Sequence, residues 1–73
     1  MDEVAIHTEY IKLQQFLKLA GFIGQGSDVK VLLAEGRVTV NGIPATERGK
    51  KVHPNDIVEV AGMGTAACVL EVE

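Results

Sequence analysis

The segment LLAEGRVTVNG, residues 32–42, limits the possible folds of this chain most strongly, because its hydrophobic period changes at one glycine. Before Gly36 the apolar residues follow the helical period of about 3.6 residues, whereas Val38 and Val40 alternate with polar residues as in a strand. A glycine directly after a helix adopts left-handed backbone at little cost, so Gly36 predicts the helix end. Asn41-Gly42 predicts a type I′ turn, because both central residues of that turn need positive φ. The segment therefore predicts a helix that leads directly into a β-hairpin.

Two short helices are predicted before the hairpin. In KLQQFLKLAG, residues 12–21, the apolar residues recur at helical spacing, and Gly21 predicts the helix end. DVKVLLAE, residues 28–35, predicts a second helix capped by Gly26 or Ser27. Phe22 or Ile23, in the loop between them, is expected to pack beneath the helix pair. The residues expected to face inward are Leu13, Phe16, Leu17, Ala20, Val29, Leu32 and Leu33.

The remaining segments predict short strands and turns. Pro44 confines the return strand of the hairpin to a sheet edge or a strand end, because proline has no N–H to donate. TERGKK, residues 46–51, predicts a polar basic loop, and HPND predicts a turn that begins before Pro54. Further strands are predicted over residues 57–60, with Val58 and Val60 on one face, and over residues 66–72; residues 3–8 could add an edge strand.

Together these elements indicate the α+β fold class. We expect two short packed helices, in a helix-turn-helix-like pair, against a small, bent, mostly antiparallel sheet. A chain of 73 residues has the length of a single domain, so one domain is expected over residues 1–73. A domain of this size buries a modest fraction of its surface and has little stability to spare.

The charges of the chain are segregated along the sequence. All seven Lys and Arg lie in residues 12–53, which contain three acids and so carry a formal charge of +4. Residues 1–11 and 54–73 contain seven acids and no Lys or Arg, so they carry −7, and the whole chain has −3. Charges more than about 8–10 Å apart are largely screened at physiological salt, so a polyanion would respond to the local basic patch. The alternative is ordinary solubilising charge.

Few residues offer catalytic or metal-binding chemistry. Cys68 is the one cysteine, so no disulfide forms within the chain, and Cys68, His7 and His53 are too few to make a zinc site. Beyond surface carboxylates, the candidates for an acid, a base or a nucleophile are His7, His53, Asp56 and Cys68. Cys68 lies in an apolar segment, which predicts a buried and inert thiol. No Ser-His-Asp order, metal motif or Walker loop is present. We therefore expect no catalysis, no metal and no cofactor.

The N-terminal segment MDEVAIH is acidic and lacks the basic and apolar regions of a secretory signal. No apolar run approaches the length of about 20 residues that a membrane-spanning helix needs. We expect a soluble cytoplasmic monomer without a membrane partner.

The order of these segments resembles the RNA-binding module first described in small-subunit ribosomal protein S-four, and in particular its small stand-alone bacterial members. KLQQFLKLAG, VKVLLAEGRVTVNG, TERGKKV and PNDIVEV follow one another in the family order with compatible spacing. The resemblance covers residues 12–61 and implies the alpha-L RNA-binding motif. Two positions depart from the family pattern: Gln25-Gly26 stand where many members carry Ser-Arg, and Gln14 stands where Asp is usual.

The resemblance also implies which residues contact RNA. Lys12 precedes the first Leu of helix one, Lys30 lies early in helix two, and Arg37 follows the helix-ending glycine. From the change of period, Lys30, Arg37, Thr39 and Asn41 are expected to line the junction between helix and hairpin. Asn41 has a second reading, in which it only forms the turn. The candidate RNA-binding residues are Lys12, Lys30, Arg37, Thr39, Asn41, Arg48, Lys50 and Lys51.

These observations favour a non-catalytic protein that binds structured RNA, either ribosomal RNA or tRNA, through phosphate contacts. Such contacts make affinity fall with rising salt. The chain has only three aromatic residues and no obvious stacking platform, which favours duplex or folded RNA over single strands. The alternative is a protein-interaction adaptor on a ribosome or an RNA-processing complex.

Overall fold

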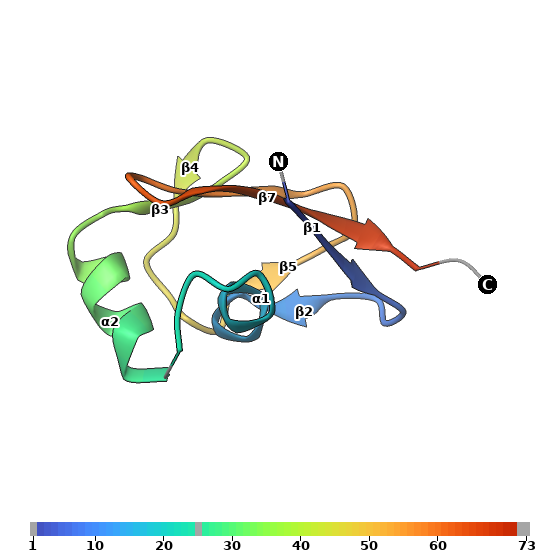
Figure 1. Ribbon diagram of the computed structural model, residues 1–73, viewed down its shortest axis with the longest axis horizontal. Helices are drawn as coiled ribbons and strands as arrows, with labels where there is room; N and C mark the ends of the chain where they lie inside the picture. Colours follow the sequence, from blue (N-terminus) through green and yellow to red (C-terminus); the bar gives the residue numbers. More distant parts are fainter. Residues whose placement is uncertain (1, 25, 72–73) are drawn as a thin grey trace.

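The computed structural model describes residues 2–24 and 26–71 and has two layers (Figure 1). One layer is a five-stranded sheet, and the other contains two helices and a two-stranded sheet. β1 pairs in parallel with β7, whereas the other neighbours in the large sheet are antiparallel. The α+β class is thus confirmed, with a mixed sheet. The large sheet has the order β1 (Asp2–Ile6), β7 (Gly64–Leu70), β6 (Ile57–Val60), β3 (Val38–Val40) and β4 (Ile43–Pro44).

Both helices end at the predicted glycines. α1 spans Leu13–Leu19 and α2 spans Gly26–Ala34. After α2, Gly36 has a φ of 66°, its N–H donates to the Leu33 carbonyl at 3.0 Å, and the Arg37 N–H donates to the Leu32 carbonyl at 3.1 Å. These two bonds form a Schellman motif, which satisfies the last carbonyls of the helix and fixes the direction of the chain that follows. The same pair of bonds, from Gly21 and Phe22, ends α1.

The start of α2 lies two residues before the predicted one. The residue that precedes α2 lies outside the described range, and the predicted cap at Gly26 or Ser27 falls on side chains that are likewise outside it. Neither helix in the described part of the chain is long and apolar enough to cross a membrane.

The hairpin that follows α2 has the predicted turn. Asn41 and Gly42 have φ values of 54° and 82°, as a type I′ turn requires, and Val40 is the register partner of Ile43. β4 contains Pro44 and is the edge strand, as expected. At the opposite edge, β1 confirms that the N-terminal segment adds a strand. β7 begins at Gly64 and ends at Leu70, earlier at both ends than the predicted 66–72, and Val72 lies outside the described residues.

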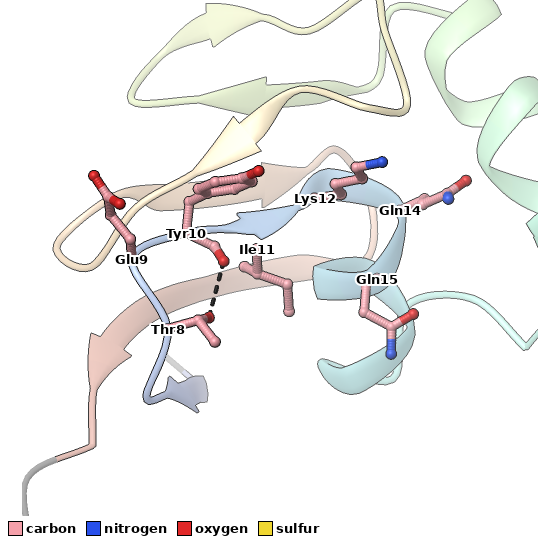
Figure 2. Close-up of a pocket in the computed structure, with 7 residues that line it drawn as sticks. All are labelled: Thr8, Glu9, Tyr10, Ile11, Lys12, Gln14 and Gln15. Atoms are coloured by element: carbon pink, nitrogen blue, oxygen red, sulfur yellow. Dashed lines mark hydrogen bonds between the residues drawn. The ribbon is translucent and has the colours of Figure 1, made fainter.

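A second, two-stranded sheet was not predicted. β2 (Ile11–Lys12) pairs antiparallel with β5 (Lys51–Val52). Lys12 therefore belongs to a strand that immediately precedes α1 (Figure 2), not to the helix, and Lys51 is a strand residue, not part of a loop. A strand of two residues is too short to show a period in the sequence, so only its tertiary pairing reveals it.

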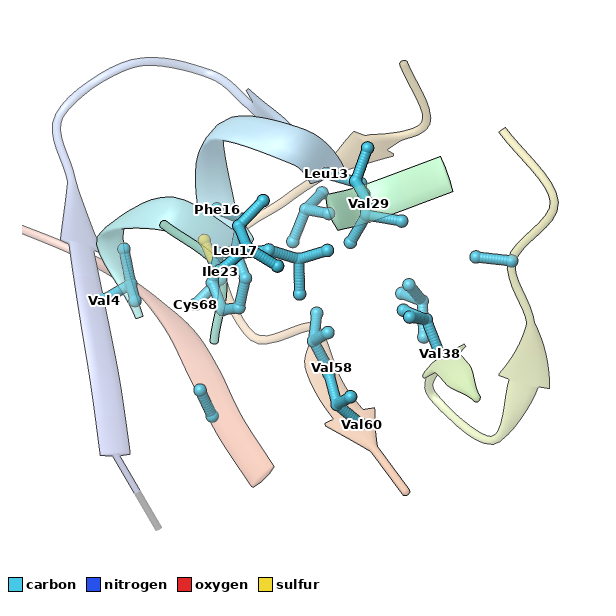
Figure 3. Close-up of a cluster of buried hydrophobic side chains, with 14 of the residues drawn as sticks. Val4, Leu13, Phe16, Leu17, Ile23, Val29, Val38, Val58, Val60 and Cys68 are labelled. Atoms are coloured by element: carbon cyan, nitrogen blue, oxygen red, sulfur yellow. The ribbon is translucent and has the colours of Figure 1, made fainter. Parts of the chain in front are cut away.

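The hydrophobic core fills the space between the two layers (Figure 3). Val38, Val58 and Val60 cover the inner face of the large sheet, and Leu13, Phe16 and Leu17 of α1 lie against them. Among the described residues, no polar or charged side chain is buried. The predicted inward residues are confirmed: Leu13, Phe16, Leu17, Val29 and Leu32 are buried, and Ala20 and Leu33 pack against the core at its border. From the loop between the helices, Ile23 is buried in the core and Phe22 packs against it.

We predict that Gly36→Ala destabilises the fold because of backbone conformation alone. A Cβ at Gly36 would meet no atom within 4 Å, so no steric contact opposes the substitution. An L-residue held in the left-handed region costs about 1–2 kcal/mol, and urea unfolding should show a loss of that size. Gly49→Ala is the matched control, because Gly49 is equally open and lacks positive φ. Equal stability of the two variants would contradict the prediction.

Candidate nucleic-acid interface

Two lysines face each other across the small sheet. Lys12 of β2 is the register partner of Lys51 of β5, and both side chains are exposed. Directly opposed residues of an antiparallel pair have Cβ atoms about 4.5–5.5 Å apart, and like charges in these positions are destabilising. In the described part of the chain, neither lysine is within salt-bridge distance of a carboxylate. The fold therefore holds two positive charges close together without a carboxylate to offset them.

Tyr10 and His53 extend this pair. They flank the two strands at the next position of the ladder, and their ring centroids lie 6.1 Å apart with an interplanar angle of 50°. The Lys51 Nζ lies 4.8 Å from the centroid of the Tyr10 ring, a cation–π contact. Figure 2 shows Tyr10 and Lys12 on one side of β2 and Ile11 on the other. We call Tyr10, Lys12, Lys51 and His53 the lysine–tyrosine cluster.

Backbone hydrogen bonds attach the other basic residues to the same region. The N–H of Leu13 donates to the Lys50 carbonyl at 2.8 Å, and the N–H of Gln14 donates to the Arg48 carbonyl at 3.0 Å. These bonds satisfy two free donors at the start of α1 and hold residues 48–50 beside it. Residues distant in sequence, Lys12 and Arg48–Lys51, are thus fixed next to each other.

Lys30 joins this region through Arg48. A surface hollow is lined by Lys30, Leu33 and Ala34 of α2 and by Thr46 and Arg48. Lys50 lies at a neighbouring hollow formed by residues 43–47. Five of the eight predicted residues therefore lie on adjoining segments, which we call the basic surface: Lys12, Lys30, Arg48, Lys50 and Lys51.

Arg37 lies elsewhere, at the start of β3. Its Nε and Nη2 both donate to the carbonyl of Ala61, at 3.2 and 2.8 Å, and its Nη1 lies 3.3 Å from the Glu35 carboxylate. The guanidinium thus ties the helix–hairpin junction to the turn between β6 and β7, and Glu35 offsets its charge. A contact between Arg37 and RNA stays a prediction, but the side chain already has protein partners.

Asn41 forms the turn and also fastens it to β6. Its Oδ1 accepts from the Ile57 N–H at 2.8 Å, and its Nδ2 donates to the Asp56 carboxylate at 2.9 Å. The second Asp56 oxygen accepts from the His53 N–H at 2.8 Å. Two neighbouring turns are therefore joined by one amide and one carboxylate. This geometry supports the second reading of Asn41, in which the residue builds the turn.

The pKa of Asp56 reflects these contacts. Partial burial acts to raise the pKa, but the His53 N–H and the Asn41 amide stabilise the charged form, as do the charges of His53 and Lys50. The net effect lowers the pKa below its ordinary value of 3.8. Asp56 therefore stabilises the fold at neutral pH.

Thr39 faces away from the basic surface. It is the register partner of Glu59 on β6 and of Pro44 on β4, and the alternation of β3 places it opposite the buried Val38 and Val40. Its side chain therefore lies on the open face of the large sheet. Lys30 lines the hollow with Arg48, and Arg37 and Asn41 contact Ala61 and Asp56, so a common lining by Lys30, Arg37, Thr39 and Asn41 stays a prediction.

Cys68 is buried in β7, as predicted. Burial is the main cause that raises the pKa of its thiol, and the charge of Asp56 adds to the shift. A neutral, enclosed thiol is a poor nucleophile. Among the described residues no group of three or more His, Cys, Asp or Glu side chains is placed to hold a metal ion.

Sequence reasoning missed Tyr10. No stacking platform was expected, yet the Tyr10 ring is exposed beside two lysines. The signal in the sequence is weak: the pairs Tyr10/Lys12 and Lys51/His53 each have strand alternation, but over too few residues to define a strand.

Comparison with known proteins identifies the family of this fold. The model of the S4 domain matches residues 4–68. The chain therefore belongs to the S4 domain family, which confirms the resemblance seen in the sequence. A relative in Bacillus subtilis (strain 168), named as a probable ribosome maturation protein RlbA, is 45% identical over 64 residues, which cover 88% of this chain and 90% of the relative.

We predict that Asn41→Gly destabilises the protein although glycine suits the turn. The variant keeps access to positive φ but loses both side-chain hydrogen bonds, which should cost about 1–3 kcal/mol at pH 7. Asp56 stabilises the fold above its ordinary pKa of 3.8, and this contribution is lost as pH falls through the lowered folded-state pKa. The difference in free energy of unfolding between Asn41→Gly and the wild type should therefore become smaller at acid pH. Urea unfolding at several pH values measures this difference.

Asn55→Gly is the matched control for this prediction. Asn55 also has positive φ, at 81°, and its side chain makes no hydrogen bond within the described residues. The control should be neutral or slightly stabilised, and an equal loss in both variants would refute the role given to the Asn41 side chain.

Proposed function

We propose that this protein binds structured RNA, ribosomal RNA or tRNA, through its basic surface and without catalysis. The observation that carries the proposal is the opposed pair Lys12 and Lys51, held together by backbone pairing. Such a pair is unfavourable in the free protein and becomes favourable when a phosphate lies between the two ammonium groups. Arg48 and Lys30 extend the cations along one surface, as a phosphate backbone requires.

The two helices and the hairpin act in this proposal as the alpha-L motif, with residues 12–61 as the core of a single RNA-binding domain. Membership of the S4 domain family supports this assignment. The name of the Bacillus subtilis relative supports a role in ribosome maturation, with ribosomal RNA as the first candidate ligand. On this reading the protein acts by occupying an RNA surface, and its partners are RNA and the ribosome.

Recognition in this proposal depends on phosphates and shape. The basic surface offers ammonium and guanidinium groups, which position RNA without reading its sequence. The five strands of the large sheet contain no Lys or Arg, so the opposite layer does not compete for RNA. This one-sided arrangement orients an acidic protein toward a polyanion.

We predict that Lys12→Gln/Lys51→Gln weakens binding to an RNA hairpin about tenfold or more at low salt, while the protein stays folded. Removal of two phosphate contacts should reduce the slope of log affinity against log salt by about 0.7–0.9 per contact. The free energy of unfolding should change by less than about 1 kcal/mol, because removal of two opposed like charges and loss of the Lys51–Tyr10 cation–π contact act in opposite directions. RNA anisotropy titrations at several salt concentrations and urea unfolding measure the two effects.

Lys18→Gln is the control for loss of a lysine outside the basic surface, and its loss of affinity is compared per charge removed. Lys18 is an exposed lysine in the last turn of α1 and lines neither of the hollows of the basic surface. A folded double variant with wild-type affinity, or a control variant with an equal loss, would show that the lysine pair is not the RNA site.

A further inference from the structure

Tyr10 is the exposed aromatic residue of the described chain. Tyr10 is 37% exposed, whereas Phe16 is fully buried and Phe22 packs against the core. The part of the Tyr10 residue that solvent reaches contributes little to folding. The Tyr10 ring lies beside Lys51 and at a surface hollow that Lys12 also lines, so it is placed to contact a ligand.

The hollow beside Tyr10 has a mainly apolar lining that also includes polar groups (Figure 2). Gln14 and Gln15 of α1 contribute amides, which offer both donors and acceptors. Thr8 donates to the Tyr10 carbonyl at 2.9 Å, which fixes the bend of the chain just before the ring. The residues that line the hollow are Thr8, Glu9, Tyr10, Ile11, Lys12, Gln14 and Gln15.

Tyr10 therefore lies next to both a cation, Lys51, and the residues that line the hollow. The Lys51 Nζ lies 4.8 Å from its ring centroid, and Lys51 is not among the residues that line the hollow, whereas Lys12 is. A nucleotide has the matching parts: an anionic phosphate, a flat base, and donors and acceptors on the base edge. Bases inside a duplex are already stacked and paired, so an aromatic side chain reaches only unpaired ones.

We propose that the hollow beside Tyr10 binds one unpaired nucleotide of the RNA, with its base against the ring and its phosphate at Lys12 and Lys51. This inference rests on the proposed RNA-binding function and narrows its ligand to folded RNA that presents an unpaired nucleotide next to a stem. The Gln14 and Gln15 amides then hydrogen-bond to the base edge. Tyr10 supplies the preference for unpaired over duplex RNA, and the lysines supply affinity for both.

The chain provides a direct probe of this contact, because Tyr10 is its one tyrosine and it has no tryptophan. Intrinsic tyrosine fluorescence of the wild-type protein therefore reports on Tyr10 alone. Two RNAs serve as ligands: a hairpin with an unpaired loop, and a blunt duplex with the same stem sequence. Saturable quenching by the hairpin, with little change at equal occupancy by the duplex, is the expected result.

Affinities of two variants complete the test. Tyr10→Ala should weaken hairpin binding about tenfold and duplex binding less than about twofold, since base–aromatic stacking is lost only with the hairpin. Tyr10→Phe keeps the ring and should stay within about twofold of wild type for both RNAs. Equal losses for hairpin and duplex, or no loss with either, would overturn the nucleotide site while leaving RNA binding intact. Failure of the wild type to bind either RNA at low salt would instead overturn the RNA-binding function.

Discussion

The candidate interface depends on the backbone hydrogen bonds between the start of α1 and residues 48–50. The Lys50 and Arg48 carbonyls accept from Leu13 and Gln14, and β2 pairs with β5 directly beside them. The first backbone N–H groups of a helix have no partner within the helix, so these two hydrogen bonds stabilise the start of α1. Their consequence is that Lys12 and Lys51 are held as neighbours. Without this connection, the basic residues of the chain would lie on unrelated segments.

The layered fold also resolves the conflict between an acidic chain and an anionic ligand. All seven Lys and Arg lie outside the strands of the large sheet, which carry Asp2, Glu3 and Glu59. The shortest dimension of the molecule is 18 Å, about twice the screening length at physiological salt. Charges on opposite layers are therefore largely independent, and the local charge of the basic surface decides how a polyanion is attracted.

Local sequence signals predicted much of the fold, but less of the site. The backbone conformations of Gly36 and Asn41-Gly42 depend on residue type and on adjacent residues, so the helix end and the hairpin could be predicted. The side-chain contacts of Arg37 and Asn41 reach residues 24 and 15 positions away, and no local pattern indicates such partners. The β2–β5 pair is similarly non-local. For this reason Tyr10 was missed, and the protein partners of Arg37 and Asn41 were not predicted.

The most direct test of this account is a map of the RNA contact on the labelled protein. Backbone amide shifts would be followed by NMR during titration with a structured RNA, first at low and then at moderate salt. If the basic surface binds RNA, amides of residues 10–12 and 48–53 shift together and the shifts fade as salt increases, while β1 and β7 stay unchanged. Shifts confined to the open face of the large sheet, or no shift at low salt, would contradict it.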